Sequence, residues 1–72
     1  MRFVVDGVER ECSPKAKFVV ETANGTSSYT LERGFSDPVA AVRFYEELAV
    51  GGNKKKRLTM ADNGKRTVLS RT

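Results

Sequence analysis

The sequence predicts an α+β protein: a small two-layer domain in which an antiparallel sheet of hairpins packs on one amphipathic helix, in the order ββ-ββ-α-ββ. Two observations predict this class. One segment, residues 36–50, has apolar residues at helical spacing and boundary signals at both ends. Elsewhere, Asp-Gly or Asn-Gly pairs separate short β-prone runs at three places, as in hairpins. A chain of 72 residues has room for a single domain, residues 1–72.

The helix has signals at both of its ends. Ser36 is expected to cap the free amides of the first turn, and Asp37 suits the positive end of the helix dipole. Pro38 is tolerated in that first turn because its missing N–H has no partner there. Gly51 and Gly52 are expected to supply the left-handed residue that ends the helix.

The expected apolar stripe of this helix faces the core of the domain. It consists of Ala41, Phe44, Tyr45 and Leu48, with Ala40 and Ala49 beside it, and Arg43, Glu46 and Glu47 fall on the opposite side. A partner-binding groove is the other interpretation of such a stripe, but a chain with so little additional apolar surface needs it for a core.

Residues 2–12 are expected to form the first hairpin, closed by Asp6-Gly7 with Val5 opposite Val8. A longer, irregular edge strand is the alternative. The second hairpin is expected to turn at Asn24-Gly25. Its predicted pairs are Val20 with Tyr29 and Phe18 with Leu31 on one face, and Val19 with Thr30, Glu21 with Ser28 and Lys17 with Glu32 on the other.

Phe35 precedes the helix and is expected to pack back onto it. The third hairpin, the basic C-terminal hairpin of residues 54–72, is expected to turn at Asn63-Gly64. Its predicted pairs are Leu58 with Leu69, Met60 with Thr67, Thr59 with Val68, Ala61 with Arg66 and Arg57 with Ser70. Sequence patterns leave the order of the strands in the sheet open.

Charge is divided sharply along the chain. Residues 1–53 hold six Lys or Arg and eight Asp or Glu, whereas residues 54–72 hold seven Lys or Arg and one Asp. The predicted contact set is Lys54, Lys55, Lys56, Arg57, Lys65, Arg66 and Arg71. On a projecting hairpin these cations suit a nucleic-acid groove or an acidic protein surface. The competing interpretation is a solubilising linker. The segment contains no aromatic residue for base stacking.

No catalytic or metal-binding set is recognisable, and we expect neither an enzyme nor a cofactor. The chain has no histidine, which excludes Ser-His and Cys-His pairs and histidine metal ligands. Cys12 is the only cysteine, so no disulfide forms within the chain, and a small structural residue is the expected role. No apolar run is long enough to cross a membrane, and the early charges do not fit a signal peptide. The expected location is cytoplasmic, in the interior of a host cell.

Two resemblances bear on function. The segment GFSDPVAAVRFYEEL and the hairpin before it, about residues 16–50, resemble the arm-type DNA-binding domains of tyrosine recombinases. The resemblance implies that an exposed sheet face reads DNA. In the predicted register that face carries Lys17, Val19, Glu21, Ser28, Thr30 and Glu32 and is nearly neutral. The size, layout and charge division of the whole chain also resemble small bacteriophage accessory proteins, such as host RNA polymerase inhibitors and anti-CRISPR proteins.

The leading prediction is a non-enzymatic, phage-type inhibitor that occupies an acidic or nucleic-acid-handling surface of a host protein through the basic C-terminal hairpin. The alternative is a small DNA- or RNA-binding domain that uses the same hairpin. A third possibility is an assembly protein that pairs through an exposed strand edge, for which the first hairpin is the best candidate. A monomer or weak dimer is expected.

Overall fold

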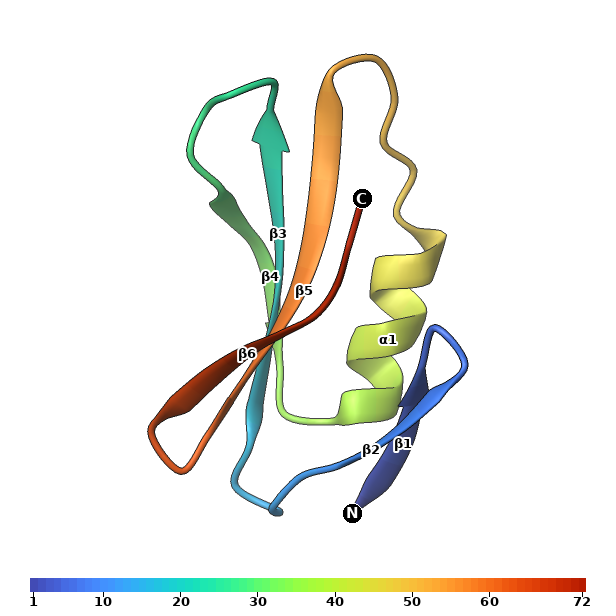
Figure 1. Ribbon diagram of the computed structural model, residues 1–72, viewed down its shortest axis with the longest axis vertical. Coiled ribbons are helices and arrows are strands. Elements are labelled where there is room, and N and C mark those ends of the chain that lie inside the picture. The colour runs from blue at the N-terminus through green and yellow to red at the C-terminus, as the bar shows by residue number, and fades with distance from the viewer.

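The computed structural model describes residues 1–72 and contains six strands and one helix. The elements are β1 (Arg2–Val5), β2 (Val8–Glu11), β3 (Lys17–Asn24), β4 (Thr30–Phe35), α1 (Pro38–Glu47), β5 (Lys54–Asp62) and β6 (Lys65–Arg71). The predicted α+β class and element order are confirmed. β1 and β2 form a two-stranded sheet, and the other strands form an antiparallel sheet in the order β4-β3-β5-β6. Helix α1 and the β1–β2 hairpin lie on the same side of this larger sheet (Figure 1).

The first hairpin has the predicted turn and register. Val5 lies opposite Val8, and Arg2 lies opposite Glu11. Asp6 and Gly7 both have positive φ, 53° and 75°, as a two-residue turn matching the strand twist requires. The short hairpin therefore forms as local turn chemistry dictates.

The third hairpin turns at Asn63-Gly64 as predicted, again with positive φ at both positions. The predicted pairs nearest the turn are confirmed, including Met60 with Thr67 and Thr59 with Val68. Beyond them the predicted register is wrong, because a bulge shifts the pairing and Leu58 lies opposite Ser70, with Arg57 opposite Arg71. The bulge leaves Leu69 as an extra residue in β6, and both Leu69 and Ser70 are buried.

The second hairpin does not turn at Asn24-Gly25, and its predicted register is wrong. β3 continues to Asn24 because β5 pairs with it along its whole length. Gly25 donates its N–H to the Asn53 carbonyl, 2.7 Å away, and the chain crosses to β4 through residues 25–29. The actual pairing, with a bulge between Val20 and Glu21, sets Phe18 opposite Phe35, Val20 opposite Arg33 and Glu21 opposite Leu31.

The helix begins one residue later than a Ser36 cap would give. Asp37 is the cap, and its carboxylate accepts hydrogen bonds from the amides of Val39 and Ala40, both at 3.3 Å. The physical reason is Pro38, which takes the first helical position and leaves the residue before it as the cap. The helix ends at an extended Leu48, before the glycines. Gly52, with φ of 61°, instead belongs to the turn that leads into β5.

The core lies between the four-stranded sheet and the layer formed by α1 and the first hairpin. Phe3 of β1 meets Phe18 of β3 edge to face, with ring centroids 5.5 Å apart. Because the hairpin covers one flank of α1, Val42 is buried along with the predicted Ala41 and Tyr45. Phe35 packs back onto α1 as expected, 5.4 Å from the Phe44 ring. The fully assembled core cluster is Phe3, Val5, Cys12, Ala16, Phe18, Val20, Ala41, Val42, Tyr45, Leu58 and Leu69.

Candidate functional site

The basic hairpin is part of the sheet and does not project from the domain. β5 is an interior strand between β3 and β6, and its four consecutive cations, residues 54–57, form the first part of this strand. Side chains alternate between the two faces of a strand. Lys56 shares a face with Leu58, which is buried against α1, whereas Lys55 and Arg57 point to the other face.

That other face is covered by no helix or hairpin, and we call it the open sheet face. The strand pairings place on it Lys17, Val19, Glu21 and Ala23 of β3, Leu31 of β4, Lys55, Arg57, Thr59 and Ala61 of β5, and Arg66, Val68 and Arg71 of β6. In Figure 1 it is the side of the larger sheet turned away from α1. The sheet face expected for a recombinase-like arm therefore has a different composition, since Ser28 lies in a loop and Thr30 pairs with the inward-facing Thr22.

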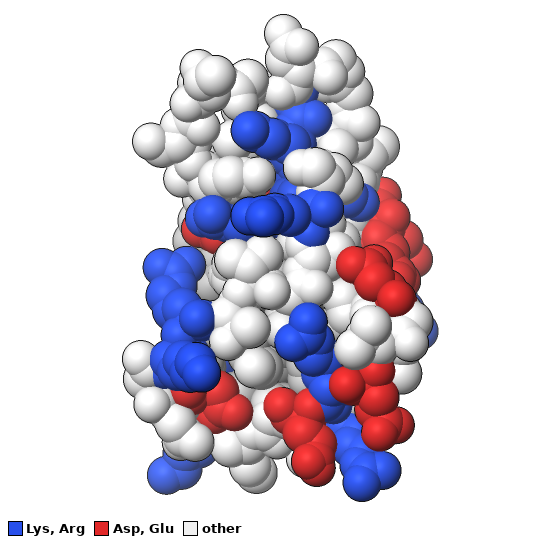
Figure 2. All heavy atoms as spheres, in the orientation of Figure 1, with Lys and Arg blue, Asp and Glu red and all other residues white.

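The open sheet face holds the whole net charge of the protein. It has five Lys or Arg and one Glu, a net charge of +4, and the remaining eight basic and eight acidic residues cancel. Figure 2 views the molecule from the side and shows Asp and Glu mainly over the helix side and the lower part. Lys and Arg lie at the left and across the upper middle of the same view, and a further group lies between acidic side chains at the lower right (Figure 2).

Arg57 lies near the centre of this face and contacts both Glu21 and Tyr29. Its Nε and Nη2 atoms lie 3.0 and 2.9 Å from Oε1 of Glu21, and its guanidinium carbon lies 3.9 Å from the centroid of the Tyr29 ring. Arg66 approaches the other Glu21 oxygen at 3.8 Å. The Glu21 side chain is only 13% exposed, so this carboxylate organises the two guanidinium groups more than it offers negative charge to a partner.

Lys56 has a structural role that its place in the cationic run did not reveal. Its Nζ donates hydrogen bonds to the carbonyl oxygens of Tyr45 and Leu48, at 2.6 and 3.1 Å, and lies 4.5 Å from the centroid of the Tyr45 ring. The ammonium group thus satisfies the free carbonyls at the end of α1, where a cation is favoured by the helix dipole. The helix therefore ends at an extended Leu48 whose carbonyl accepts from Lys56, and not at a left-handed glycine as expected.

The seven predicted contact residues fall into three groups. Lys55 and Arg71 lie on the open sheet face without an ion-pair partner, and Arg57 and Arg66 lie there beside Glu21. Lys56 is committed to α1. By the pairing pattern, Lys54 and Lys65 lie on the side of α1 at the ends of β5 and β6, both exposed and outside the open sheet face.

The structure adds two residues that sequence reasoning missed. Lys17 joins the cations because it lies opposite Ala61 of β5, and Tyr29 supports Arg57 from the loop before β4. Both depend on the long-range pairing of β3 with β5. The sequence contains one signal for Lys17, the β-prone alternation of residues 17–21. This alternation places Lys17 on the same strand face as Val19 and Glu21.

Apolar side chains lie among these cations. Leu31 is 67% exposed and Val68 is 42% exposed, and Val19 is half-buried between their strands. Tyr29 is the one aromatic ring at this face, and the Arg57 guanidinium covers it. The open sheet face thus combines arginines with aliphatic groups and offers no free aromatic ring on which a base could stack.

Cys12 and the carboxylates of α1 are the other groups whose chemistry the sequence raised. Cys12 is buried, and no three His, Cys, Asp or Glu side chains lie together in a way that could hold a metal ion. Glu46 and Glu47 are exposed on α1 and make no ion pair. Helix α1 lacks both the length and the apolar character needed to cross a membrane.

Comparisons with protein-family models, with curated protein sequences and with solved structures found no match to this chain.

Proposed function

We propose that this protein is a non-enzymatic binding module that occupies an acidic or nucleic-acid-handling surface of a host protein through its open sheet face. One observation carries the proposal: the whole net charge of +4 lies on the one sheet face that no other element covers. Such a concentration of charge speeds association with an acidic partner and restricts the choice of partner. The resemblance in size and layout to small phage inhibitors suggests that occupying the surface is itself the activity.

The contact set proposed for this face differs from the one expected for a projecting hairpin. Its unpaired cations are the exposed Lys17 and Arg71 and the half-buried Lys55. Two further guanidinium groups, those of Arg57 and Arg66, lie beside the Glu21 carboxylate. Leu31 and Val68 supply the apolar area that a specific protein contact needs at its centre. Arginines are frequent energetic centres of interfaces, and an ion pair that already orients the guanidinium group reduces the side-chain freedom lost on binding.

A pair of matched double variants tests the proposal. Lys55→Glu with Arg71→Glu changes two unpaired cations on the open sheet face, and Lys54→Glu with Lys65→Glu makes the same charge change elsewhere. Partners are first captured from a lysate of the host cell with the wild-type protein, and affinity is then measured with the purified partner. We expect the first variant to weaken binding about tenfold or more and the second to change it by less than about threefold. An equal loss of affinity in the two double variants would show that the open sheet face is not the binding surface.

Nucleic acid is the second candidate, favoured by the five cations on the open sheet face. A mobility-shift titration with random duplex and with single-stranded DNA separates the two. Direct binding would weaken steeply with salt, in proportion to the number of phosphates contacted. Tight, salt-dependent binding that is lost with the Lys55 and Arg71 changes would show that the target of the open sheet face is nucleic acid and not a protein.

A further inference from the structure

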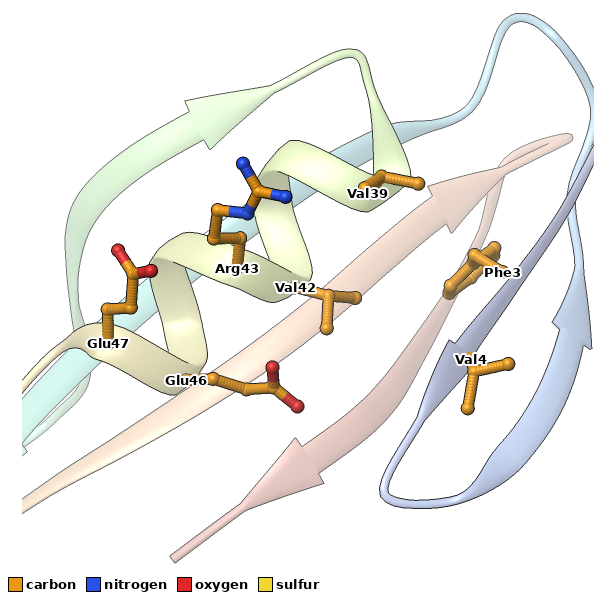
Figure 3. Close-up of a pocket in the computed structure, with 7 residues that line it drawn as sticks. All are labelled: Phe3, Val4, Val39, Val42, Arg43, Glu46 and Glu47. Carbon is orange, nitrogen blue, oxygen red and sulfur yellow. The ribbon is translucent and has the colours of Figure 1, made fainter.

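A second surface lies on the opposite side of the domain, between α1 and β1. It is a groove of about 350 Å³ with Phe3 and Val42 at its base. Val4 and Val39 line it as well, and each is 55% exposed. Figure 3 shows α1 on one side of the groove and β1 on the other, with β2 on the far side of β1. Apolar side chains left exposed around a concave surface mark an interaction site.

The strand that borders this groove has a free edge. In an antiparallel pair, hydrogen-bonded and non-hydrogen-bonded residue pairs alternate. Met1 and Cys12 exchange two backbone hydrogen bonds, at 2.9 and 3.1 Å, so Phe3 and Val5 bond with β2 as well. The N–H and C=O groups of Arg2 and Val4 therefore point away from β2 and have no backbone or side-chain partner.

Charge on the helix side of the groove is mostly negative. Glu46 and Glu47 lie at one end of the lining and Arg43 lies one turn earlier, and none of the three makes an ion pair. In Figure 3 the Glu46 side chain extends from α1 toward β1. The groove thus combines unpaired strand groups, apolar side chains and unpaired carboxylates within one small surface.

We infer that this groove binds an extended segment of a partner protein, which adds to β1 as a third strand. Strand addition supplies backbone hydrogen bonds, and alternate side chains of the segment enter the apolar groove. The matching segment has small aliphatic residues at alternate positions and a Lys or Arg beside Glu46 and Glu47. The volume is at the lower end of the range of ~300–1,000 Å³ for ligand sites, which suits a few side chains of a peptide and not a folded domain.

This binding is independent of the open sheet face, because the two surfaces lie on opposite sides of the four-stranded sheet. A protein that uses both holds an acidic surface on one side and a basic extended segment on the other. The two functions can be lost separately, so charge reversal at Lys55 and Arg71 is expected to leave peptide binding unchanged.

The test is selection of a random twelve-residue peptide display library on the intact protein, followed by affinity measurement with the enriched peptides. The key variant is Val4→Pro, since proline removes the outward N–H but no bond of the β1–β2 ladder. Val4→Ala is the matched control, because it keeps that N–H. A second variant, Glu46→Lys with Glu47→Lys, changes only exposed helix positions and covers the case in which Val4→Pro fails to fold.

We expect enriched peptides to alternate aliphatic and polar residues and to carry Lys or Arg. Their affinity should fall at least tenfold with Val4→Pro and with the Glu46 and Glu47 changes. Val4→Ala should lower it by a clearly smaller factor, because this variant shortens a side chain that lines the groove but keeps the outward N–H. Amide shifts in the wild-type protein should centre on Arg2, Val4 and Val39. No enriched peptide, equal binding to Val4→Pro, or shifts confined to the open sheet face would overturn the proposal. A concentration-dependent dimer that Val4→Pro abolishes would assign the edge to a second copy of the chain instead.

Discussion

The ammonium group of Lys56 lies 2.6 Å from the carbonyl oxygen of Tyr45, so one cation of the basic segment serves the end of the helix. Lys56→Met keeps most of the apolar stem but leaves the Tyr45 and Leu48 carbonyls without their charged donor. We expect a loss of about 2 kcal/mol in the free energy of unfolding, measured by urea denaturation. Lys54→Met changes an exposed neighbour on the same strand and should alter stability by less than ~0.5 kcal/mol. Equal effects would mean that the Lys56 hydrogen bonds contribute nothing.

The observed register of β3 and β4 predicts that Phe35 matters far more than Leu31. Phe35 lies opposite Phe18 and packs on Phe44, whereas Leu31 is 67% exposed. Phe35→Ala should lower the free energy of unfolding by about 2 kcal/mol, less than for a fully buried ring because Phe35 is half-buried. Leu31→Ala should change it by less than ~0.5 kcal/mol. Thermal denaturation of both variants checks the order, and a larger loss for Leu31→Ala would support the register expected from an Asn24-Gly25 turn.

The raised pKa of Tyr45 predicts how the free energy of unfolding declines at alkaline pH. Burial, the largest cause, raises the pKa of its phenol above the ordinary value of 10.0. The unfolded chain therefore loses this proton at a lower pH than the folded protein, and the stabilisation is lost as pH rises from about 10 through the folded pKa. Tyr45→Phe should flatten this part of the stability profile, as measured by urea midpoints between pH 9 and pH 11. An alkaline slope in Tyr45→Phe equal to that of the wild type would contradict this assignment.

The lowered pKa of Asp62 predicts a loss of stability at acidic pH. The hydroxyl of Ser13 donates to its carboxylate at 2.6 Å and the Ser13 amide donates at 2.9 Å, and these bonds hold the pKa of Asp62 below its ordinary value of 3.8. The resulting stabilisation is present above about pH 3.8 and is lost as pH falls through the folded pKa. Asp62→Asn should therefore flatten the acid side of the profile below pH 4. An acid slope in Asp62→Asn equal to that of the wild type would contradict this assignment.

Glu21 links stability to charge on the open sheet face. Glu21→Gln removes the carboxylate from the Arg57 and Arg66 side chains, and leaves Arg57, which is 26% exposed, without its ion pair. We expect a loss of about 1–3 kcal/mol in the free energy of unfolding, together with stronger retention on a heparin column. Glu47→Gln makes the same charge change on α1 and should increase retention less. Unchanged stability in Glu21→Gln would show that the cluster is not held by this carboxylate.

Local patterns predicted the parts of the fold that local chemistry controls. Asp6-Gly7 and Asn63-Gly64 turn where expected because both residues of each pair adopt positive φ. Asn24-Gly25 is a similar pair but is not the centre of a two-residue hairpin turn, because β3 continues along β5 as far as Asn24. The Gly25 N–H donates to the Asn53 carbonyl, and the Asn24 carbonyl accepts from the Ser27 amide in a turn that begins one residue later than expected. A distant strand can thus override a favourable turn pair, and no feature within residues 17–32 reveals it.

The candidate site shows the same division between local and distant causes. The concentration of cations in residues 54–72 is visible in the sequence, but their distribution over two faces depends on the partner strands of β5. Lys56 is the clearest case, since its acceptors Tyr45 and Leu48 belong to a helix that ends before the basic segment begins. Long-range pairing, which propensity and spacing do not encode, decided which cations remain free to meet a partner.

The buried side chain of Leu58 has a consequence for evolution of the surface as well as for the core. Leu58 is fully buried on the strand that carries residues 54–57, so it fixes the phase of the alternation along that strand. Insertion of one residue between Arg57 and Leu58 would place Lys54 and Lys56 on the outer surface in the place of Lys55 and Arg57. It would also deprive α1 of the ammonium group at its end. Natural variation in this strand should therefore proceed by substitution and avoid changes in length.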